Sequence, residues 1–397
     1  MLLLEVLLAA AAFAILIPIL ILSTEVLAAS FSDDGKSGHE GARPRLAVII
    51  PAHDEAYGIG DTLQFLIPQL QAGDRLLVVA DNCTDDTAAV ASAAGAEVIV
   101  RRDESRRGKS YALDFAVRHL EADPPAVVLI VDADCRAEEG SVDRLARVCA
   151  RTGRPVQALS LSHAPPGAGV GMRIAEFAFA LKNRVRPLGL RRLGLPCHLM
   201  GTGMAFPWAC LSAATLATGH IAEDLKLGLE LASVGYPALF CPEAQVSSFF
   251  PASEEGFKSQ RARWEHGYLD VLMKDAPAVL LKALSTLNRE LLALGLDLCV
   301  PPIALLTLLC AAVWIASAIF FAVTRVDFPL LIVSAAVALL TLCVLTSWAR
   351  YGRQILSLGS LALAITYAFL KIPLYFRFLV ARQFEWVRTK RDEDRSP

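Results

Sequence analysis

The sequence lacks three features that would have pointed to common classes of protein. None of its nine cysteines forms a Cys-x-x-Cys pair, and no group of cysteines and histidines has zinc-site spacing. The formal net charge is only −2, so the charge balance gives no sign of a nucleic-acid partner. There is no internal repeat, and no low-complexity tract apart from the apolar ends. We therefore expect the cysteines to be small buried hydrophobic residues in a reducing compartment.

Apolar residues are abundant and concentrated at the two ends. The 397 residues are 55% hydrophobic with a positive mean hydropathy, which is above the usual range of soluble proteins. Residues 1–29 are nearly all apolar and long enough to cross a bilayer. They lack the basic start of a secretory signal peptide. We expect an uncleaved N-terminal anchor, and a cleaved signal peptide is the alternative.

Further apolar stretches lie within residues 299–380. Pro301–Phe321 and Phe328–Trp348 are clear candidate spans, and Leu356–Leu370 is a weaker one. Before them, residues 276–298 carry charged side chains in an otherwise apolar stretch. This pattern predicts an amphipathic helix that lies in the membrane interface.

The side of the membrane on which the chain ends is ambiguous. With a cytosolic central domain, three C-terminal spans would place the tail, residues 381–397, outside. That tail is basic, however, and basic flanks favour the cytosol. We expect a cytosolic tail, which requires one predicted span to be re-entrant or interfacial. The first suspect is residues 356–380, which Lys371 and Pro373 interrupt.

Residues 46–275, which follow a polar linker at residues 30–45, alternate between strand and helix patterns. Four short runs predict strands, at Leu46–Ile50, Leu76–Ala80, Glu97–Val100 and Val127–Val131. Helical stretches separate them, so we expect an α/β domain with an open, mostly parallel sheet. In such sheets ligands bind beyond the carboxyl ends of the strands.

Acidic residues directly follow two of these strands. Asp81 follows the second strand, where it could accept hydrogen bonds from a nucleobase or ribose. The alternative for this stretch is that its side chains cap the helix that begins near Asp86, which the sequence favours for Thr84 and Asp85 and leaves open for Asp81. Asp132-Ala133-Asp134 follows the fourth strand. Two carboxylates at this spacing can face one cation, and oxygen ligands suit Mg²⁺ or Mn²⁺ that bridges to phosphates. The Asp132-Ala133-Asp134 motif alone is also compatible with a solvated turn.

Two further motifs could act on a phosphate or a hydroxyl. Arg106–Ser110 resembles the end of a P-loop, but the first glycine of that pattern would fall on Asp103. A looser role remains, with Lys109 near phosphates at a helix N-terminus. Glu223-Asp224 precedes a predicted helix. Either these carboxylates cap the helix, or Asp224 is a general base for a hydroxyl.

The most unusual stretch is Gln260-Arg261-Ala262-Arg263-Trp264. Its Gln and Arg side chains at helical spacing can contact a diphosphate, and Trp264 offers a flat face to a sugar. The alternative is a basic helix near the membrane with a tryptophan at the lipid interface. Gly201-Thr202-Gly203 predicts a tight turn, which either admits a ligand close to the backbone or only connects two elements.

The order of these motifs resembles that of the family 2 inverting glycosyltransferases, above all their membrane-integrated members. The resemblance covers roughly residues 45–275 and the flanking apolar segments. Gln260, Arg263 and Trp264 match the Q-x-x-R-W signature of the branch with cellulose, hyaluronan and chitin synthases and ceramide glucosyltransferases. The implied fold is a GT-A-like α/β nucleotide-sugar-binding domain with a mostly parallel sheet, flanked by N- and C-terminal transmembrane helices.

The resemblance also implies roles for individual residues. The expected nucleotide contacts are Pro51, His53, Glu55, Asp81, Lys109 and Asp132. The expected ligands of Mg²⁺ or Mn²⁺ are Asp132 and Asp134. The expected diphosphate and acceptor contacts are Gln260, Arg263, Trp264, Gly201 and Thr202. Asp224 matches the catalytic base, with Glu223 beside it.

Some features depart from the family pattern. Asn82-Cys83 replaces the more usual Gly-Ser, and Ala222 replaces a common Thr before Glu-Asp. The F-x-V-T-x-K segment of cellulose synthases is absent, and the membrane part is small for a secretion channel. These two absences weaken the case for a processive synthase that exports a polymer.

The sequence therefore predicts an inverting glycosyltransferase in a bacterial-type inner membrane, with a cytosolic catalytic domain. The expected donor is a nucleotide-sugar, most simply a UDP-sugar. The expected acceptor is a growing polysaccharide or lipid-linked glycan of exopolysaccharide or cell-envelope biosynthesis, whose machinery is a candidate partner. A ceramide-type lipid glucosyltransferase is the alternative. An idle nucleotide-sugar-binding scaffold would be expected to have lost the base or metal pair, and a transporter to show paired interrupted spans.

Overall fold

The computed structural model describes residues 1–31 and 42–380. These residues form two compact units, and each unit draws together segments that are distant in sequence. The described parts of the first unit are residues 1–31, 166–194 and 272–380, and those of the second are residues 42–165 and 195–271. Most of the expected linker and the whole basic tail at 381–397 lie outside the described residues.

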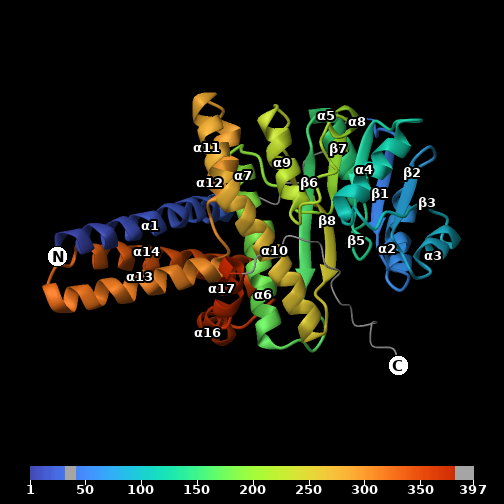
Figure 1. Cartoon of the computed structure of the whole chain (residues 1–397). Helices are drawn as coiled ribbons and strands as arrows, with labels where there is room; N and C mark the ends of the chain where they lie inside the picture. The colour runs from blue at the N-terminus through green and yellow to red at the C-terminus, as the bar shows by residue number, and fades with distance from the viewer. Residues whose placement is uncertain (32–41, 381–397) are drawn as a thin grey trace. The chain divides into compact units, whose positions relative to one another are not determined.

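The second unit is built on an eight-stranded mixed sheet with the order β3-β2-β1-β4-β7-β6-β8-β5 (Figure 1). The strands are β1 (Leu46–Ala52), β2 (Arg75–Asp81), β3 (Glu97–Arg101), β4 (Val127–Ile130), β5 (Arg136–Ala137), β6 (Val156–His163), β7 (Met204–Pro207) and β8 (Leu239–Phe249). β3, β2, β1 and β4 are parallel, β7 is antiparallel to β4 and β6, and β8 is parallel to β6. The expected α/β domain with a mostly parallel sheet is confirmed.

The parallel strands are apolar on both faces because helices cover both faces. In β1, Leu46 and Ile50 belong to one buried cluster, whereas Ala47 and Ile49 belong to another. Helices α2 (Ile59–Leu66) and α5 (Ser141–Thr152) contribute to the first cluster. The second cluster takes its helical residues from α4 (Lys109–Leu120), α8 (Trp208–Ser212) and α9 (Glu223–Ser233). The remaining helices of this unit are η1 (Ile67–Gln69), α3 (Thr87–Ala93) and all but the last three residues of α10 (Glu254–Lys274).

Gly203, which immediately precedes β7, should be intolerant of any side chain. Its φ is +65°, and a Cβ there would lie 2.8 Å from the Ala158 Cβ and 2.9 Å from Val246 Cγ2. Gly203→Ala should therefore lower the free energy of unfolding by about 2–4 kcal/mol, through backbone strain and overpacking. The measurement is the thermal unfolding midpoint of the purified protein.

Gly153 provides the matched control for this prediction. It ends α5 with a φ of +63°, but a Cβ there would meet no atom within 4 Å. Gly153→Ala should show the backbone strain alone, about 1 kcal/mol. Equal unfolding midpoints for the two variants would contradict the packing argument for Gly203.

All the regular secondary structure in the described residues of the first unit is helical. Its elements are α1 (Leu2–Ser30), α6 (Val170–Ala180), η2 (Leu181–Val185), α7 (Arg186–Arg192), α11 (Ala276–Ser285), α12 (Arg289–Leu298), α13 (Ile303–Thr324), α14 (Phe328–Ser347), η3 (Trp348–Gly352), α15 (Leu358–Ala362), α16 (Ala364–Phe369) and α17 (Ile372–Val380). Helices α1, α13 and α14 lie side by side (Figure 1). Residues 276–298 form two helices where the sequence predicted one, because Asn288 accepts hydrogen bonds from the Glu290 and Leu291 N–H groups and begins α12.

Four segments of this unit are long and apolar enough to cross a membrane. They are Leu2–Ser30, Ile303–Thr324, Phe328–Gly352 and Leu358–Val380. The last has the lowest hydropathy, 1.5 against 2.5 or more for the others. It also contains three short helices, α15, α16 and α17, rather than one continuous helix. Length and composition thus fit association with a membrane.

Glu25, which interrupts the apolar N-terminal stretch, belongs to a buried ionic cluster within the first unit. Arg186 Nε of α7 is 3.0 Å from Glu25 Oε2 of α1 and 3.0 Å from Asp297 Oδ1 of α12. All three residues are buried. The cluster joins α1 to α7 and α12, and removing one partner would leave a buried charge poorly compensated.

Candidate functional site

The carboxyl ends of β1 and β2 bring together several of the expected nucleotide contacts. Pro51 lies in β1, which is parallel to β2 and hydrogen-bonded to it. His53 Nδ1 is 2.7 Å from the backbone oxygen of Asp81, the last residue of β2. The Glu55 N–H donates to Thr87 Oγ1 at 2.7 Å. The two loops that follow these strands are therefore joined by hydrogen bonds at the expected ligand edge of the sheet.

Asp81 is held by Arg101, a residue that the sequence analysis did not single out. Arg101 Nη1 donates to Asp81 Oδ1 at 2.6 Å, and both side chains are nearly buried. Burial raises the pKa of Asp81, and the guanidinium of Arg101 opposes that rise. The two residues are partners in the parallel pairing of β2 and β3. Their positions at the ends of adjacent predicted strands were the signal that could have identified the pair.

Asn82 explains why this chain can dispense with the usual glycine after Asp81. Its φ is +52°, in the left-handed region that asparagine tolerates better than most non-glycine residues. The Asn82 amide donates to Asp81 Oδ1 at 3.1 Å and to the Asp103 backbone oxygen at 3.2 Å. It also accepts the Asp103 N–H at 2.7 Å. Asn82 therefore keeps the turn and adds hydrogen bonds that a glycine could not make.

Lys109 lies at the centre of the expected phosphate and metal residues. Its Nζ donates to Asp132 Oδ1 and, at 2.6 Å, to the Gly201 backbone oxygen, and it is 3.9 Å from Glu223 Oε1. Burial alone would lower the pKa of Lys109. The nearby carboxylates of Asp132, Glu223 and Asp224 nevertheless raise it above its ordinary value. The lysine is therefore a fixed positive charge among three acidic groups.

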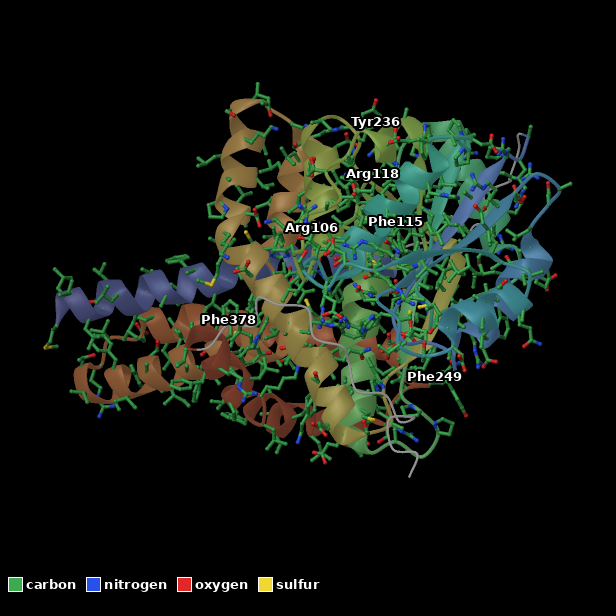
Figure 2. The ribbon with its side chains drawn as sticks, turned by 45° about the vertical axis from the view of Figure 1, so that its right-hand side comes forward. Arg106, Phe115, Arg118, Tyr236, Phe249 and Phe378 are labelled. Carbon is green, nitrogen blue, oxygen red and sulfur yellow. The ribbon has the colours of Figure 1, made fainter. Side chains whose placement is uncertain are left out.

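The arginines of the P-loop-like stretch are arranged differently from Lys109. Figure 2 shows Arg106 on the loop that precedes α4, and it shows Phe115 and Arg118 on α4 itself. Arg106 and Arg107 are exposed, and Arg107 pairs with a residue of its own loop. Among the described residues of this stretch, Lys109 is the one whose side chain pairs with the acidic residues Asp132 and Glu223.

Asp132 and Asp134 lie just beyond β4 and could hold a divalent cation. Ligand atoms of Asp132, Asp134 and Cys135 lie within 4.8 Å of one another. Burial raises the pKa of Asp132, Lys109 lowers it and Asp134 raises it further. Burial also raises the pKa of the Cys135 thiol well above its usual range, so this thiol is a poor ligand for a hard cation. Carboxylate oxygens are the ligand atoms that Mg²⁺ and Mn²⁺ prefer.

The Gly201-Thr202 turn brings backbone close to the acidic residues. The Asp132 N–H donates to Thr202 Oγ1 at 3.1 Å. At Gly201, where φ is +86°, a Cβ would lie 3.4 Å from Asp224 Oδ2 and 3.8 Å from Lys109 Nζ. Open space beside the Asp224 carboxylate thus depends on a glycine at this position.

Glu223 and Asp224 begin α9, and neither is the N-cap residue, which is Ala222. Burial, followed by the charge of Asp224, raises the pKa of Glu223 to about 7, while Lys109 opposes the rise. Near neutral pH Glu223 is therefore partly protonated.

Gln260, Arg263 and Trp264 lie on α10 at positions i, i+3 and i+4, which places them on one side of the helix. The Trp264 ring is 6.3 Å from the ring of Phe250, which follows β8. The structure thus forms three groups from the predicted residues. One group surrounds Asp81, one surrounds Lys109, and one lies along α10.

The mixed, mostly parallel sheet with these carboxylates beyond its strands has the GT-A fold. The sequence model of the family described as glycosyltransferase like family 2 matches residues 44–267, more than half of the chain. The chain therefore belongs to this family, as the order of its motifs predicted.

Curated relatives agree with this assignment. The chain is 26% identical over 258 residues to the probable glycosyltransferase YdaM of Bacillus subtilis, covering 58% of this chain and 57% of that protein. The match thus spans little more than half the length of YdaM. An uncharacterized glycosyltransferase of Mycobacterium tuberculosis, Rv0539, is 32% identical over 188 residues, which are 41% of this chain and 80% of that protein.

A solved structure has a similar fold along nearly its whole length. It is the mannosyltransferase PcManGT of Pyrobaculum calidifontis, in complex with GDP-Man and Mn²⁺. The TM-score is 0.53 with 19% sequence identity, and the match covers 94% of this chain and 97% of that one.

Proposed function

We propose that this protein is a membrane-bound, metal-dependent, inverting glycosyltransferase. It transfers a sugar from a nucleotide-sugar to a hydroxyl group of a growing polysaccharide or a lipid-linked glycan. The observation that carries the proposal is the cluster in which Lys109 contacts Asp132 and Gly201 and in which Gly201 approaches Asp224. Family membership supports the transfer of a sugar, and the cluster supplies groups for both the leaving diphosphate and the attacking hydroxyl.

The donor's nucleotide would bind at the ends of β1 and β2. Arg101 and Asn82 both donate to Oδ1 of Asp81, which leaves Oδ2 as the oxygen for a base N–H group. His53 and Glu55 lie in the loop joined to this strand end. A uracil base is the expectation from the sequence. PcManGT was solved with GDP-Man, so a guanine nucleotide also belongs in the test.

Lys109, Asp132 and Asp134 would act on the diphosphate. The two carboxylates fit Mg²⁺ or Mn²⁺ by the chemistry of their oxygens and by their proximity. A cation held there supplies positive charge to the departing nucleoside diphosphate. Lys109 supplies a second positive charge on the same side, since its raised pKa keeps it protonated. Gln260 and Arg263 of α10 are the further candidates for diphosphate contacts.

Asp224 is the proposed general base. It accepts the proton of the acceptor hydroxyl while the hydroxyl oxygen forms a bond to the anomeric carbon. The bond from that carbon to the diphosphate oxygen breaks on the opposite side, which inverts the configuration. Gly201 leaves space beside Asp224 Oδ2. Trp264 is the proposed stacking surface for the acceptor, in keeping with the Q-x-x-R-W branch.

The four candidate spans support association with a membrane. The proposed placement is a multi-pass protein of an inner membrane with a cytosolic catalytic domain. The α11–α12 segment, residues 276–298, is the proposed interfacial part. Segment 358–380 is the proposed re-entrant or interfacial one, because its helices are short. Without that segment, three spans remain among the described residues, which is few for a polymer-exporting channel and favours a lipid glucosyltransferase as the second candidate.

Turnover by the purified protein in lipid or mild detergent tests this proposal. UDP-glucose, UDP-GlcNAc, UDP-galactose, UDP-GlcA and GDP-mannose would be supplied in turn with Mn²⁺, with and without a membrane lipid extract. We expect nucleoside diphosphate release from one donor, increased by the extract, and the product's size distinguishes lipid glycosylation from polymer growth. Nucleotide binding without release from any donor would contradict the proposal and favour an idle scaffold.

A further inference from the structure

His220 links the segment before the proposed base to helix α10. Its Nδ1 accepts the Ala222 N–H at 3.0 Å, and its Nε2 is 3.1 Å from Asp270 Oδ2. Because Nδ1 accepts a hydrogen bond, the ring proton is on Nε2, from which it is donated to Asp270. Ala222 directly precedes Glu223 and Asp224, whereas Asp270 lies on the helix that carries Trp264. One imidazole thus bridges two elements that each carry part of the proposed acceptor site.

Close packing supports the same junction from both sides. At Gly267 of α10, a Cβ would lie 3.2 Å from Ala222 Cβ and 3.2 Å from Ile221 Cγ1. Gly267 follows Trp264 by three residues, so the two are neighbours on the helix surface. On the other side, the Gly219 N–H donates to Ser110 Oγ at 3.1 Å, beside Lys109. Residues 219–222 are therefore held between α4 and α10.

We propose that His220 and Asp270 are positioning residues that set the distance between Asp224 and the acceptor-binding side of α10. The inference rests on the proposed function, because it takes Asp224 as the base and Trp264 as the acceptor surface. A base and its hydroxyl must be within hydrogen-bond distance, and a misplacement of about 1 Å lowers rates about a hundredfold. Most of the proposed donor contacts lie on other elements, β1, β2, β4 and α4, and only Gln260 and Arg263 lie on α10. Loss of the link between His220 and Asp270 should therefore impair transfer to the acceptor more than binding of the donor.

Loss of the link should uncouple donor cleavage from transfer. Water can replace the acceptor hydroxyl as the attacking group without any contact to α10. Because most of the proposed donor contacts lie outside α10, a variant with a loosened α10 should keep most of its donor binding and water attack but lose transfer to the acceptor. The fraction of donor that is hydrolysed would rise. A merely structural role would instead lower hydrolysis, transfer and the folded fraction in the same proportion.

Two variants break the link from opposite ends. His220→Asn keeps a side-chain oxygen that can accept the Ala222 N–H two residues on, but it is too short to reach Asp270. Asp270→Ala removes the other partner. Each should lower transfer about tenfold to a hundredfold and leave the donor Kd nearly unchanged. The double variant should be no worse than either single variant, because both remove one interaction. Asp270→Asn retains an acceptor oxygen and should be close to wild type.

His119→Asn is the matched control. His119 Nε2 is 2.6 Å from Glu97 Oε1, and both side chains are more than a third exposed. This control makes the same substitution in the same kind of pair, at a surface position that the proposed mechanism does not use. It should leave transfer, hydrolysis and donor binding at wild-type values.

The experiment measures product formation, donor hydrolysis, nucleotide binding and thermal unfolding for these variants and for Asp224→Asn. Reduced transfer with a larger hydrolysed fraction and intact donor binding would support the inference. If His220→Asn and Asp270→Ala both kept the wild-type ratio of donor hydrolysis to transfer while Asp224→Asn was inactive, the proposed role of His220 would be wrong. The proposed base would stand. Near-normal transfer by Asp224→Asn would overturn the proposed base and this inference together.

Discussion

Asp224→Asn should lower sugar transfer by about a thousandfold, because a positioned general base contributes about 10²–10⁴ to such a reaction. Asparagine has the shape of aspartate but cannot take the proton of the acceptor hydroxyl. Donor binding should persist, since the expected donor contacts lie at the strand ends and around Lys109. Two quantities would be measured: the initial rate of product formation, and nucleotide binding by calorimetry.

Glu230→Gln is the control for this substitution. Glu230 is on the same helix as Asp224 and is exposed, so the variant removes one carboxylate from α9 without altering the acidic cluster. Its transfer rate should equal that of the wild type. The base assignment would be wrong if a folded Asp224→Asn protein transferred sugar at a rate near that of Glu230→Gln.

Glu223, next to the proposed base, gives a prediction about pH dependence. Its pKa is raised to about 7, so it is protonated more and more as the pH falls below neutral and charged above it. Glutamine resembles the protonated form. Glu223→Gln should therefore differ least from wild type at mildly acidic pH, and it should retain far more activity than Asp224→Asn there.

The sequence predicted the parts of the fold in which local pattern and tertiary environment agree. The strands that end near Asp81 and Asp132 are apolar runs that the sheet buries on both faces. Because the carboxyl ends of parallel strands share one edge, the approximate location of the site followed from the strand assignments. The second half of the sheet was not predicted. β7 has only four residues, and its antiparallel place between β4 and β6 depends on long-range pairing.

Residues that act through distant partners were also missed. The link from His220 to Asp270 joins positions 50 residues apart, and neither lies in a recognised motif. Arg101 could have been predicted, since it directly follows the predicted strand Glu97–Val100, as Asp81 directly follows the predicted strand Leu76–Ala80. By contrast, Lys109 was predicted from the sequence because it follows Gly108 in a stretch that resembles the end of a P-loop. Its contacts with Asp132 and Gly201 then required the structure.

Asp134→Asn, like removal of divalent cations with a chelator, should lower turnover by at least about a hundredfold, because uncompensated charge develops on the departing diphosphate. Asp134 is the cleaner target of the two carboxylates. Asp132 also neutralises the partly buried Lys109, so Asp132→Asn would destabilise the fold as well. The measurement is the rate as a function of Mn²⁺ concentration, together with direct Mn²⁺ binding.

The control for this prediction is Asp61→Asn, an exposed carboxylate paired with Arg136 at 3.2 Å. Its Mn²⁺ dependence should match that of the wild type. Full turnover by metal-free protein would contradict the proposed role of Asp132 and Asp134. The folded state should not depend on the metal, because Lys109 neutralises Asp132 without it. A chelator should thus abolish turnover and leave the thermal unfolding midpoint almost unchanged, which separates a catalytic cation from a structural one.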